Sequence, residues 1–580
     1  MPQAQTIAGG QFLTSAAAAD AVFVRDDLTE EQRLFGRTAA EFMRQEVLPV
    51  VDQLYHHDWD LTRRLLRKAG EIDLLRLEIP AEYGGLGLDL ISASYVGEQI
   101  ALDPSFGGSL GAHTSIGTLP LVYFGTPEQK ARYLSRLASG ELIGAYALTE
   151  PEAGSDALAS RTTATLTPDG RHYVLNGQKM WITNGGFADL FTLFAKVDGQ
   201  KFTAFLVERS AGVVSGRDEV KLGLDGSSTT ALMLDQVTVP VENVLGTIGQ
   251  GHKVAFNILN LGRVKLGARN MAGVRQALNN SVKYAKARRQ FGRPIAEFGL
   301  IRQKLAGMAI LGFVGDAMAY RTLGDVERVL ESTDRGDGSV VLRTIESFAV
   351  ECSINKVWTS EALAWAVDEA IQVYGGNGYS REFPVERAYR DARITRIYEG
   401  TNEINRLLIP TRLVKQSPEL FTLPSARDVL NRPLSAATGP LAGEREFLER
   451  AKRLTIALLA RAAAACGERL KDEQEVLGRI ADLAIESYAI ESGIVRAERL
   501  VSRSDPRAAV ACDAARVHAA EAADRIAQRS REVLSALSSL DADRDWVIDL
   551  RRLTGYDGGD TIAARRRIAG AVIDAGKSIF

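Results

Sequence analysis

The chain has 580 residues, and at about 100–200 residues per domain it contains material for several domains. It carries 70 Lys and Arg against 73 Asp and Glu, so its net charge of −3 predicts no nucleic-acid partner. Its 46% hydrophobic and 25% charged content is typical of a folded globular protein. The sequence contains no apolar run of about 18 residues, which is the length that would predict a membrane-spanning helix.

The start of the chain, Met1–Val24, has neither a basic, Arg-rich leader nor a secretory signal pattern. We therefore expect a cytoplasmic protein of bacterial type, peripheral to a membrane at most. The three cysteines are far apart in sequence, which argues against a disulfide framework and a CxxC metal site. Any redox chemistry then needs a cofactor.

Residues 1–27 have no periodicity and are expected to form an N-terminal tail. Thr29 through Gln32 matches a capping box, and apolar residues follow at helical spacing, so a helix is expected to start near Thr29. The pattern stays helical to residue 145, which predicts an N-terminal helical domain over 28–145.

Residues 146–248 contain short runs of residues that favour β-strands, separated by turn signals such as Asn176-Gly177 and Asp198-Gly199. We expect a middle antiparallel β-domain. The predicted strands are Thr162–Leu166, Tyr173–Leu175, Met180–Thr183, Leu190–Val197, Phe202–Val207 and Ala231–Val239.

Long helical periods return over 249–413 and predict a helical bundle domain. Four prolines between 414 and 440 predict a linker. Residues 441–580 are Ala- and Arg-rich, with balanced basic and acidic residues and helical spacing, and predict a C-terminal helical extension. The expected fold class is therefore multidomain α+β.

Common catalytic motifs do not occur in this sequence. It has no P-loop, no GxGxxG after a strand, no HExxH and no GxSxG elbow, and its six histidines are scattered. We predict no metal site, because the adjacent His56-His57 pair is better explained as a solvated helix end.

Two segments around the predicted β-domain combine features suited to a cofactor. A strand-like start at Tyr146 runs into the Gly154-Ser155-Asp156 turn, whose hydroxyl and backbone donors could hold an anion or a polar ring edge. Trp181 lies two residues from the Thr183 hydroxyl at a strand end, where ring and hydroxyl could contact a heteroaromatic group. Taken alone, each segment is better explained as ordinary structure, the first as a Ser/Asp turn and the second as a core Trp at a strand end.

The bundle contributes a glycine-rich segment, Gln372–Tyr379, and the segment Arg396–Glu403. Glu399 lies between apolar residues and Gly400, just before a predicted helix. Burial there raises the pKa of a carboxylate toward the range useful for a general base, whereas the helix N-terminus lowers that pKa. A helix-capping Glu remains the alternative reading.

Taken together, these segments resemble the signatures of the acyl-CoA dehydrogenase family. The resemblance rests on Ala147–Ala159, on Trp181-Ile182-Thr183, on Gln372 through Gly378-Tyr379 to Asp391, and on Tyr398–Thr401, in the family's order and spacing. It covers roughly residues 28–413. The family's order of a helical, a β and a helical domain is the order expected from the residue pattern along this chain.

The resemblance implies an FAD enzyme that oxidises the Cα–Cβ bond of an acyl-CoA to a trans-2-enoyl-CoA in fatty acid β-oxidation. Glu399 matches the base that removes the α-proton, while a hydride leaves to flavin N5. The electron acceptor would be an electron-transferring flavoprotein. The enolate-like oxygen would be stabilised by a flavin ribityl hydroxyl and by the backbone N–H of Glu399.

The resemblance also carries site roles over to individual positions. The implied cofactor-binding residues are Tyr146, Leu148, Thr149, Ser155, Trp181, Ile182, Thr183, Arg288, Phe291, Gln372, Gly375, Gly376, Thr401 and Glu403. The implied substrate-binding residues are Ser155, Asn260, Arg263 and Gly400. Arg288, Phe291 and the Gln372–Gly376 segment match positions that reach the FAD of a neighbouring subunit.

Three features are similar to the very-long-chain branch of the family. They are Gly299 at a position where many members have Gln, the C-terminal extension, and the small residues of Gly107–His113, which would leave room for a long acyl chain. In that branch the extension accompanies a homodimer, rather than the common tetramer, and membrane-surface association. The balanced charges and broken linker argue against one long membrane-binding amphipathic helix here.

Two other functions remain as alternatives. A flavin oxidase or monooxygenase on the same scaffold would also use Glu399, but it would pass electrons to oxygen and make peroxide. A non-catalytic assembly or scaffold protein would keep the fold and use the extension to bind a partner, and the presence of Glu399 argues against it.

Overall fold

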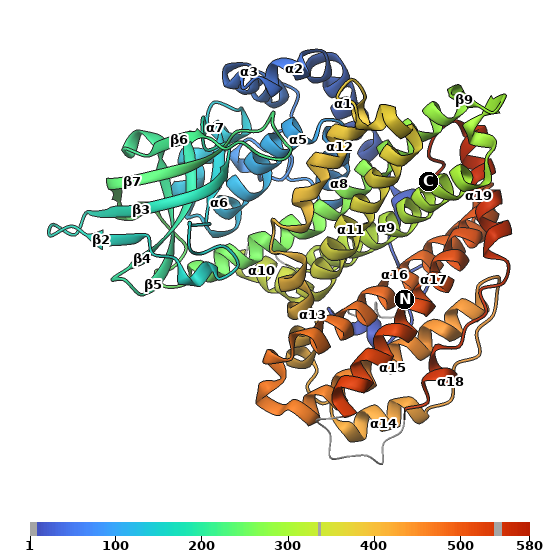
Figure 1. The fold of residues 1–580 in the computed structure, drawn as a ribbon. Coiled ribbons are helices and arrows are strands. Elements are labelled where there is room, and N and C mark those ends of the chain that lie inside the picture. Colours follow the sequence, from blue (N-terminus) through green and yellow to red (C-terminus); the bar gives the residue numbers. More distant parts are fainter. Residues whose placement is uncertain (1–7, 334–337, 539–547) are drawn as a thin grey trace. The chain divides into compact units, whose positions relative to one another are not determined.

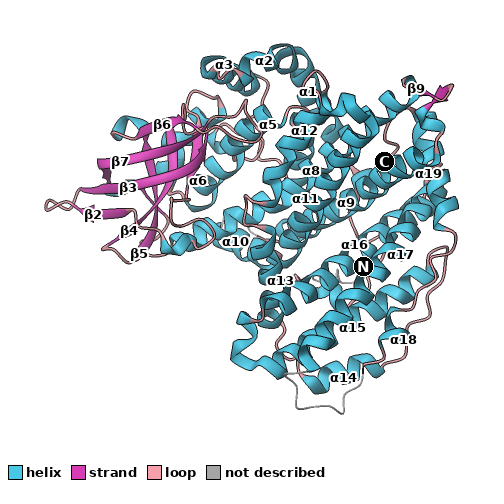
Figure 2. Cartoon of the chain, in the orientation of Figure 1, coloured by secondary structure: helices cyan, strands magenta, loops and turns pink. Residues whose placement is uncertain are grey.

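The structure is a computed structural model, and it describes residues 8–333, 338–538 and 548–580. The chain divides into two compact units (Figure 1). The sheet unit comprises residues 28–265 and 330–346, and the bundle unit comprises 1–27, 266–329 and 347–580. Strands are concentrated in the sheet unit, whereas the bundle unit is almost entirely helical (Figure 2).

The bundle unit contains the helices of the predicted bundle and of the predicted extension. Its helices are α9 (Gly299–Glu331), α11 (Ala349–Tyr374), α12 (Pro384–Ala392), α13 (Asn402–Gln416), α14 (Leu423–Asn431), α15 (Ala442–Cys466), α16 (Gln474–Ser502), α17 (Ala508–Ser538), α18 (Leu550–Thr554) and α19 (Thr561–Ala575). Helix α8 (Gly251–Ala287) begins in the sheet unit and ends in the bundle unit. A short hairpin of β9 (Arg289–Gln290) and β10 (Arg293–Pro294) follows α8.

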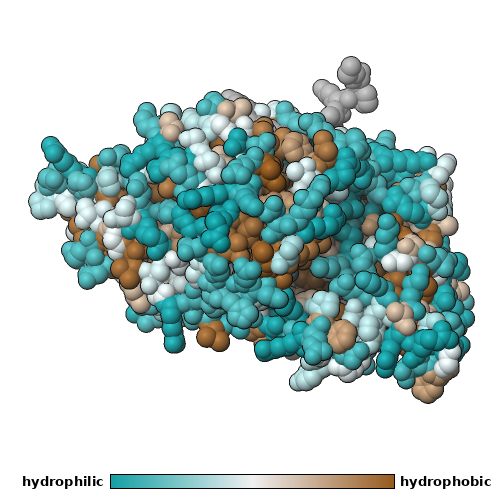
Figure 3. Space-filling view, turned by 90° about the horizontal axis from the view of Figure 1, so that it is seen from above, coloured by the Kyte–Doolittle hydropathy of each residue, from teal (hydrophilic) through white to brown (hydrophobic). Residues whose placement is uncertain are grey.

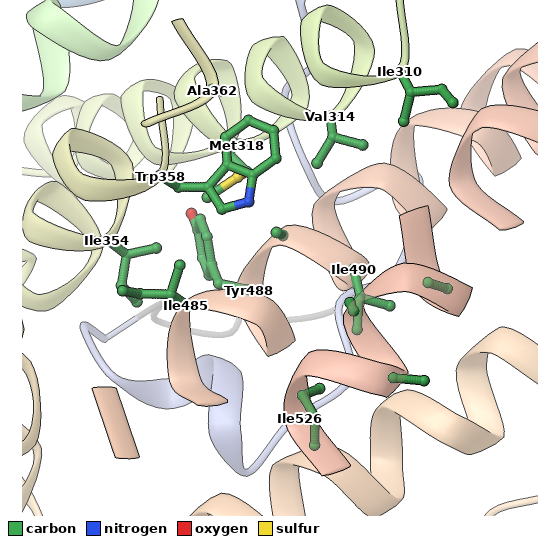
Figure 4. Packing of buried hydrophobic residues seen from close by; sticks show 14 of the residues in the cluster. Ile310, Val314, Met318, Ile354, Trp358, Ala362, Ile485, Tyr488, Ile490 and Ile526 are labelled. Atoms are coloured by element: carbon green, nitrogen blue, oxygen red, sulfur yellow. The ribbon is translucent and has the colours of Figure 1, made fainter. Parts of the chain in front are cut away.

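The extension and the bundle share one hydrophobic core. Buried side chains of α9 and α11 face buried side chains of α16 and α17 (Figure 4). Met318 and Trp358 on the bundle side lie near Tyr488 of α16, whose hydroxyl hydrogen-bonds the Thr322 hydroxyl at 2.7 Å. Because this contact buries apolar surface of both the extension and the bundle, the extension stabilises the bundle and is not an independent module on a linker.

Residues 8–27 of the predicted tail and residues 423–431 of the predicted linker are structured parts of the bundle unit. Phe12 of the N-terminal segment packs edge-on against Tyr488, with ring centroids 5.1 Å apart. Asp26 pairs with the fully buried Arg496 at 2.8 Å. The segment 414–440 contains helix α14, with Pro424 in its first turn, where a missing N–H costs no hydrogen bond.

Buried charges in the bundle unit are paired across elements. Glu491 of α16 accepts hydrogen bonds from Lys452 of α15 at 2.6 Å and from Arg321 of α9 at 3.0 Å. Burial opposes ionisation of Glu491, but the two cations lower its pKa to about 2. In the extension, Arg565 pairs with Glu521 and Arg567 pairs with Asp513, so acidic residues balance these two basic charges.

Within the described residues, no helix has the length and apolar character needed to cross a lipid bilayer. On the face shown in Figure 3, hydrophobic residues lie in patches between hydrophilic ones.

The sheet unit begins with short helices, and the predicted start near Thr29 is confirmed. The Thr29 side chain accepts from the Gln32 N–H, and the Gln32 side chain accepts from the Thr29 N–H, as a capping box requires. The helices are α1 (Glu30–Phe42), α2 (Val51–Tyr55), α3 (Trp59–Glu71), α4 (Leu90–Ile100), α5 (Pro104–Gly111), α6 (Leu119–Phe124) and α7 (Pro127–Ala138), with α10 (Gly338–Ser347) returning to this unit later.

The middle domain is a mixed sheet. Its strands are β1 (Gly144–Ala147), β2 (Thr163–Leu166), β3 (His172–Thr183), β4 (Leu190–Val197), β5 (Lys201–Glu208), β6 (Val214–Asp218), β7 (Thr229–Pro240) and β8 (Val244–Leu245). They lie in the order β6-β7-β3-β2-β4-β5-β8, with β1 beside β4. Most neighbours are antiparallel as predicted, but β1 and β2 run parallel to β4. The long connections between these strands allow this direction.

The two predicted strands around Gly177 form one strand, β3, with irregular register at two places. The pairing of β3 with β7 shifts between Leu175 and Gly177 and again between Lys179 and Ile182. At the second shift Trp181 has a positive φ of 61°. Such a bulge turns the Trp181 ring away from the core, whereas Ile182 points into it.

His113 connects the helices of the sheet unit to strand β1. It lies in a π-helical turn, Ala112–Gly117, directly after α5, and its side chain is fully buried. Its Nδ1 accepts from the Gly144 N–H at 2.9 Å, so Nε2 carries the hydrogen and donates to the Leu137 carbonyl at 3.0 Å. Burial lowers the pKa of His113 to about 4, against smaller opposing contributions from Leu137 and Asp189.

This shift predicts a pH-dependent stability of the sheet unit. Since the pKa of His113 is about 4 when folded and about 6.5 when unfolded, its contribution is complete above pH 6.5 and decreases as the pH falls toward 4. Between pH 7 and pH 5 the wild type should lose about 2 kcal/mol more unfolding free energy than His113→Gln, which does not titrate. Denaturant unfolding at both pH values tests this. Parallel losses in the two proteins would contradict it.

Candidate active site

Strand β1 and the end of strand β3 bring together several predicted cofactor residues of the sheet unit. The Met180 N–H donates to the Thr149 carbonyl at 2.9 Å, so the segment after β1 lies beside the end of β3. The Trp181 ring is 52% exposed, and the Thr183 side chain is half-buried. A ring and a hydroxyl are therefore available at the surface of this strand end.

Other predicted residues of this group turn inward. Tyr146 packs edge-on against Phe194, and its hydroxyl donates to the Ala255 carbonyl at 3.4 Å. Leu148 and Ile182 are buried as well, so here the backbone rather than the side chain is the part able to meet a ligand. Ser155 is exposed, in the segment after the Glu150–Ala153 turn.

An ion pair under these segments has no role in the sequence interpretation. Lys179 of β3 is fully buried, and its ammonium donates to Glu150 at 2.7 Å and to the Leu148 carbonyl at 3.4 Å. Glu150 also accepts from the Arg161 and Thr162 N–H groups. A Lys in the inward-facing register of a strand, with a Glu in the preceding segment, is the signal that could have identified the pair.

The pKa of each member of this pair depends on the charge of the other member. Burial lowers the pKa of Lys179 to about 8, while the Glu150 charge partly restores it. Burial also opposes ionisation of Glu150, but Lys179 and the neighbouring donors leave the pKa of Glu150 below its usual value. The pair thus joins the segment after β1 to the end of β3.

The predicted substrate residues Asn260 and Arg263 lie one turn apart on helix α8, within the sheet unit. Both are buried, and Arg263 donates to the Asn260 Oδ1 at 2.9 Å. Two buried polar side chains in contact on one helix can offer hydrogen bonds to a polar group of a substrate.

In the bundle unit, the predicted cofactor residues near the β9–β10 hairpin are strongly exposed. Phe291 is 92% exposed with a positive φ of 51°, and Arg288 and Gln372 are exposed. Around Gly375 and Gly376, an added Cβ would meet nothing within 4 Å, so a ligand could approach this backbone closely.

Tyr284, near the end of α8, contacts Tyr374 and Asn377 at the glycine-rich segment. Its ring stacks on that of Tyr374 with centroids 4.0 Å apart, and its hydroxyl donates to the Tyr374 carbonyl at 3.2 Å. The Asn377 amide donates to the same hydroxyl at 3.0 Å. The end of α11 and the start of the hairpin are thus held near each other.

Glu399 lies in a reversal of the chain just before α13. It is half-buried with its Oε2 atom shielded from solvent, and it has a positive φ of 57°, followed by 80° at Gly400. Thr401 caps α13 by accepting from the Ile404 N–H at 3.3 Å. The pKa of the exposed Glu403 is lowered, first by its own backbone N–H at the helix start. A carboxylate in a sparsely populated conformation is typical of functional sites.

Each of these two groups, taken by itself, offers contacts that suit one part of a flavin dinucleotide. An exposed indole and a hydroxyl at a strand end suit a heteroaromatic ring, whereas an exposed arginine and an open glycine backbone each suit a pyrophosphate. The fold has an N-terminal helical domain, a middle sheet and a helical bundle with an extension.

Comparison with known proteins establishes the family. Sequence models of the acyl-CoA dehydrogenase N-terminal, middle and C-terminal domains match residues 29–141, 145–237 and 249–414, and a further acyl-CoA dehydrogenase C-terminal domain matches 450–552. The chain belongs to the acyl-CoA dehydrogenase family. It is an FAD-dependent oxidoreductase that acts on CH–CH groups.

Similar proteins cover most or all of the chain. A probable acyl-CoA dehydrogenase of Bacillus subtilis is 42% identical over 98% of both chains. The human very long-chain specific acyl-CoA dehydrogenase is 39% identical over 81% of this chain and 74% of its own. The crystal structure of an acyl-CoA dehydrogenase of Bacillus anthracis complexed with FAD has a TM-score of 0.96 and 40% identity, and covers 99% of this chain and 100% of that chain.

The buried pair Lys179–Glu150 makes a prediction that a single and a double variant can test. Lys179→Met leaves the Glu150 carboxylate buried without its cation and should cost about 3–5 kcal/mol of unfolding free energy and loosen FAD binding. Adding Glu150→Gln removes that charge, so the double variant should be more stable than Lys179→Met alone. Denaturant unfolding and fluorescence of released FAD measure both effects. A double variant that is less stable than Lys179→Met would refute the pairing.

Proposed function

We propose that this protein oxidises the Cα–Cβ bond of acyl-CoA thioesters to trans-2-enoyl-CoA, with Glu399 as the general base. The conformation of Glu399 is the observation that carries the proposal. A half-buried carboxylate with a left-handed backbone, directly before the N-terminus of α13, is held in one orientation and partly removed from water. Its sequence position also matches the base of the family that the chain belongs to.

The α-proton of a thioester is too weakly acidic for a carboxylate unless the developing negative charge on the thioester oxygen is stabilised. We assign that stabilisation in part to the backbone N–H of Glu399, as the family resemblance implies. Bound FAD supplies the acceptor for the hydride at its N5 atom. Trp181, Thr183 and Thr149 would hold the ring end, and Arg288, Phe291 and Gln372–Gly376 would reach the FAD of a second subunit.

Replacement of Glu399 tests the base directly. Glu399→Gln keeps the shape of the side chain but cannot accept the proton, so flavin reduction by acyl-CoA should fall by about 10²–10⁴-fold while the protein keeps its yellow FAD. Anaerobic stopped-flow absorbance of the flavin measures the rate. The exposed Glu419→Gln serves as the control and should reduce flavin normally. Near-wild-type reduction in Glu399→Gln would place the base elsewhere.

The acceptor of the electrons distinguishes the dehydrogenase from the flavin oxidases. We propose an electron-transferring flavoprotein as the acceptor and a homodimer in the cytoplasm as the working form. The exposed Phe291 and the open Gly375-Gly376 backbone support a dimer, since these positions match those that reach a neighbouring subunit's FAD. Peroxide formed during turnover in air would favour the oxidase alternative.

We further propose that the substrates are long-chain acyl-CoA thioesters. Around Gly108, an added Cβ would meet only the Ser227 Oγ, at 3.9 Å, so this part of α5 leaves space. Gly107 is different, because its Cβ would meet the Ile100 carbonyl at 3.1 Å and the glycine allows close packing of α5 against that carbonyl. Space at Gly108 therefore supports the long-chain proposal, whereas Gly107 serves packing.

Titration with acyl-CoA of different lengths tests this proposal. Under anaerobic conditions a saturated long-chain acyl-CoA should bleach the flavin stoichiometrically, whereas a four-carbon acyl-CoA should not. Gly108→Leu should reduce bleaching by the long chain, because the larger side chain fills the open space. Equal bleaching by both substrates would refute the chain-length proposal, and bound flavin that no acyl-CoA bleaches would refute the dehydrogenase and favour other flavin chemistry or a scaffold role.

A further inference from the structure

A buried lysine lies against the loop that carries Glu399. Lys356, in the middle of α11, is fully buried. Its ammonium donates to the Gly400 carbonyl at 2.7 Å and to the Asn402 Oδ1 at 2.6 Å. Both acceptors follow Glu399 within three residues, so one side chain from a long helix contacts the loop at two points.

Asn405 of α13 supplies a second donor to the same backbone. Its side-chain amide donates to the Gly400 carbonyl at 2.8 Å and to the Thr401 carbonyl at 3.0 Å. The Gly400 carbonyl therefore accepts from two buried side chains that come from two different helices. A carbonyl held from two directions has little freedom to rotate.

The conformation of Glu399 makes this anchoring important. A left-handed conformation costs a non-glycine residue about 1–2 kcal/mol, and such conformations persist only when the surroundings enforce them. The φ of 57° at Glu399 and of 80° at Gly400 reverse the chain just before the anchored carbonyl. Fixing the Gly400 carbonyl thus fixes the direction of the chain after Glu399 and, with it, the orientation of the carboxylate and the Glu399 N–H.

We propose that Lys356 is a positioning residue for the reaction, because its ammonium holds the Gly400 carbonyl and thereby the reactive conformation of Glu399. This inference rests on the proposed role of Glu399 as the base. Lys356 itself acts only through the loop and removes no proton from the substrate.

Lys356→Met tests the proposal in the FAD-loaded enzyme with two readouts. The first is exchange of the substrate α-hydrogens with D2O, followed by mass spectrometry, which reports proton removal by Glu399. The second is amide hydrogen exchange of the peptide that spans Glu399–Thr401, which reports the loop itself. We expect α-hydrogen exchange to fall by about 100-fold and the loop amides to exchange faster, with FAD content and acyl-CoA affinity retained.

Three variants complete the experiment. Lys452→Met removes another buried lysine of the bundle unit, far along the chain, and should lower stability without slowing α-hydrogen exchange. Lys356→Arg keeps a cationic donor and should recover part of the rate. Asn405→Leu removes the second donor and should slow α-hydrogen exchange by about tenfold. It also serves as the test variant if Lys356→Met does not fold.

The outcomes separate this proposal from the proposed function. If Lys356→Met, or Asn405→Leu in its place, exchanges α-hydrogens as fast as Lys452→Met, Lys356 has only a structural role and the inference is overturned. Glu399→Gln is measured in the same assay. If it exchanges α-hydrogens normally, the base itself is misassigned, whatever the lysine variants do.

Discussion

Both groups of candidate site residues depend on the same constraint: a buried backbone segment that leaves regular structure needs partners for its polar atoms. In each unit a buried lysine ammonium donates hydrogen bonds to polar atoms of such a segment. Lys179 reaches the Leu148 carbonyl and the Glu150 carboxylate in the sheet unit, and Lys356 reaches the Gly400 carbonyl in the bundle unit. A long, flexible side chain can cross from a regular element to an irregular segment, and its charge strengthens the hydrogen bonds that it makes there.

Helix α11, which carries Lys356, is stabilised in turn by the C-terminal extension. Buried side chains of α9 and α11 meet those of α16 and α17, and the Lys452–Glu491–Arg321 cluster joins α15, α16 and α9. The N-terminal segment packs against the same region, because the Phe12 ring contacts the Tyr488 ring and Asp26 forms an ion pair with Arg496. The extension is therefore part of the support of the bundle, and its loss would uncover apolar surface and leave buried charges without partners.

The long-chain proposal depends on a distinction between two neighbouring glycines of α5. At Gly107 an added Cβ would lie 3.1 Å from the Ile100 carbonyl oxygen, and this tight contact indicates a packing role. Gly108 has open space beside it and is not required by packing. The sequence run contains both without distinguishing them, and only the distances around each backbone position separate a tight contact from available room.

Much of the architecture follows from local sequence patterns. The Thr29–Gln32 capping box predicted the start of α1, and short β-rich runs between turn signals predicted most strands of the sheet. Signature motifs around Trp181 and Glu399 predicted the family and its cofactor. These signals are local because a cap, a strand period and a motif each depend on residues that are neighbours in sequence.

Other features were decided by tertiary contacts between distant residues. Residues 423–431 form a helix and residues 8–27 join the bundle, because partners far along the chain cover their apolar side chains. The bulge that exposes Trp181 follows from the register of β3 against β7. Lys179 and Lys356 look like ordinary polar residues in apolar segments until Glu150 and Gly400 are seen beside them. The sequence alone indicated most of the elements and the family. The tertiary structure decided which buried charges and carbonyls are paired, because these pairings depend on distance in space.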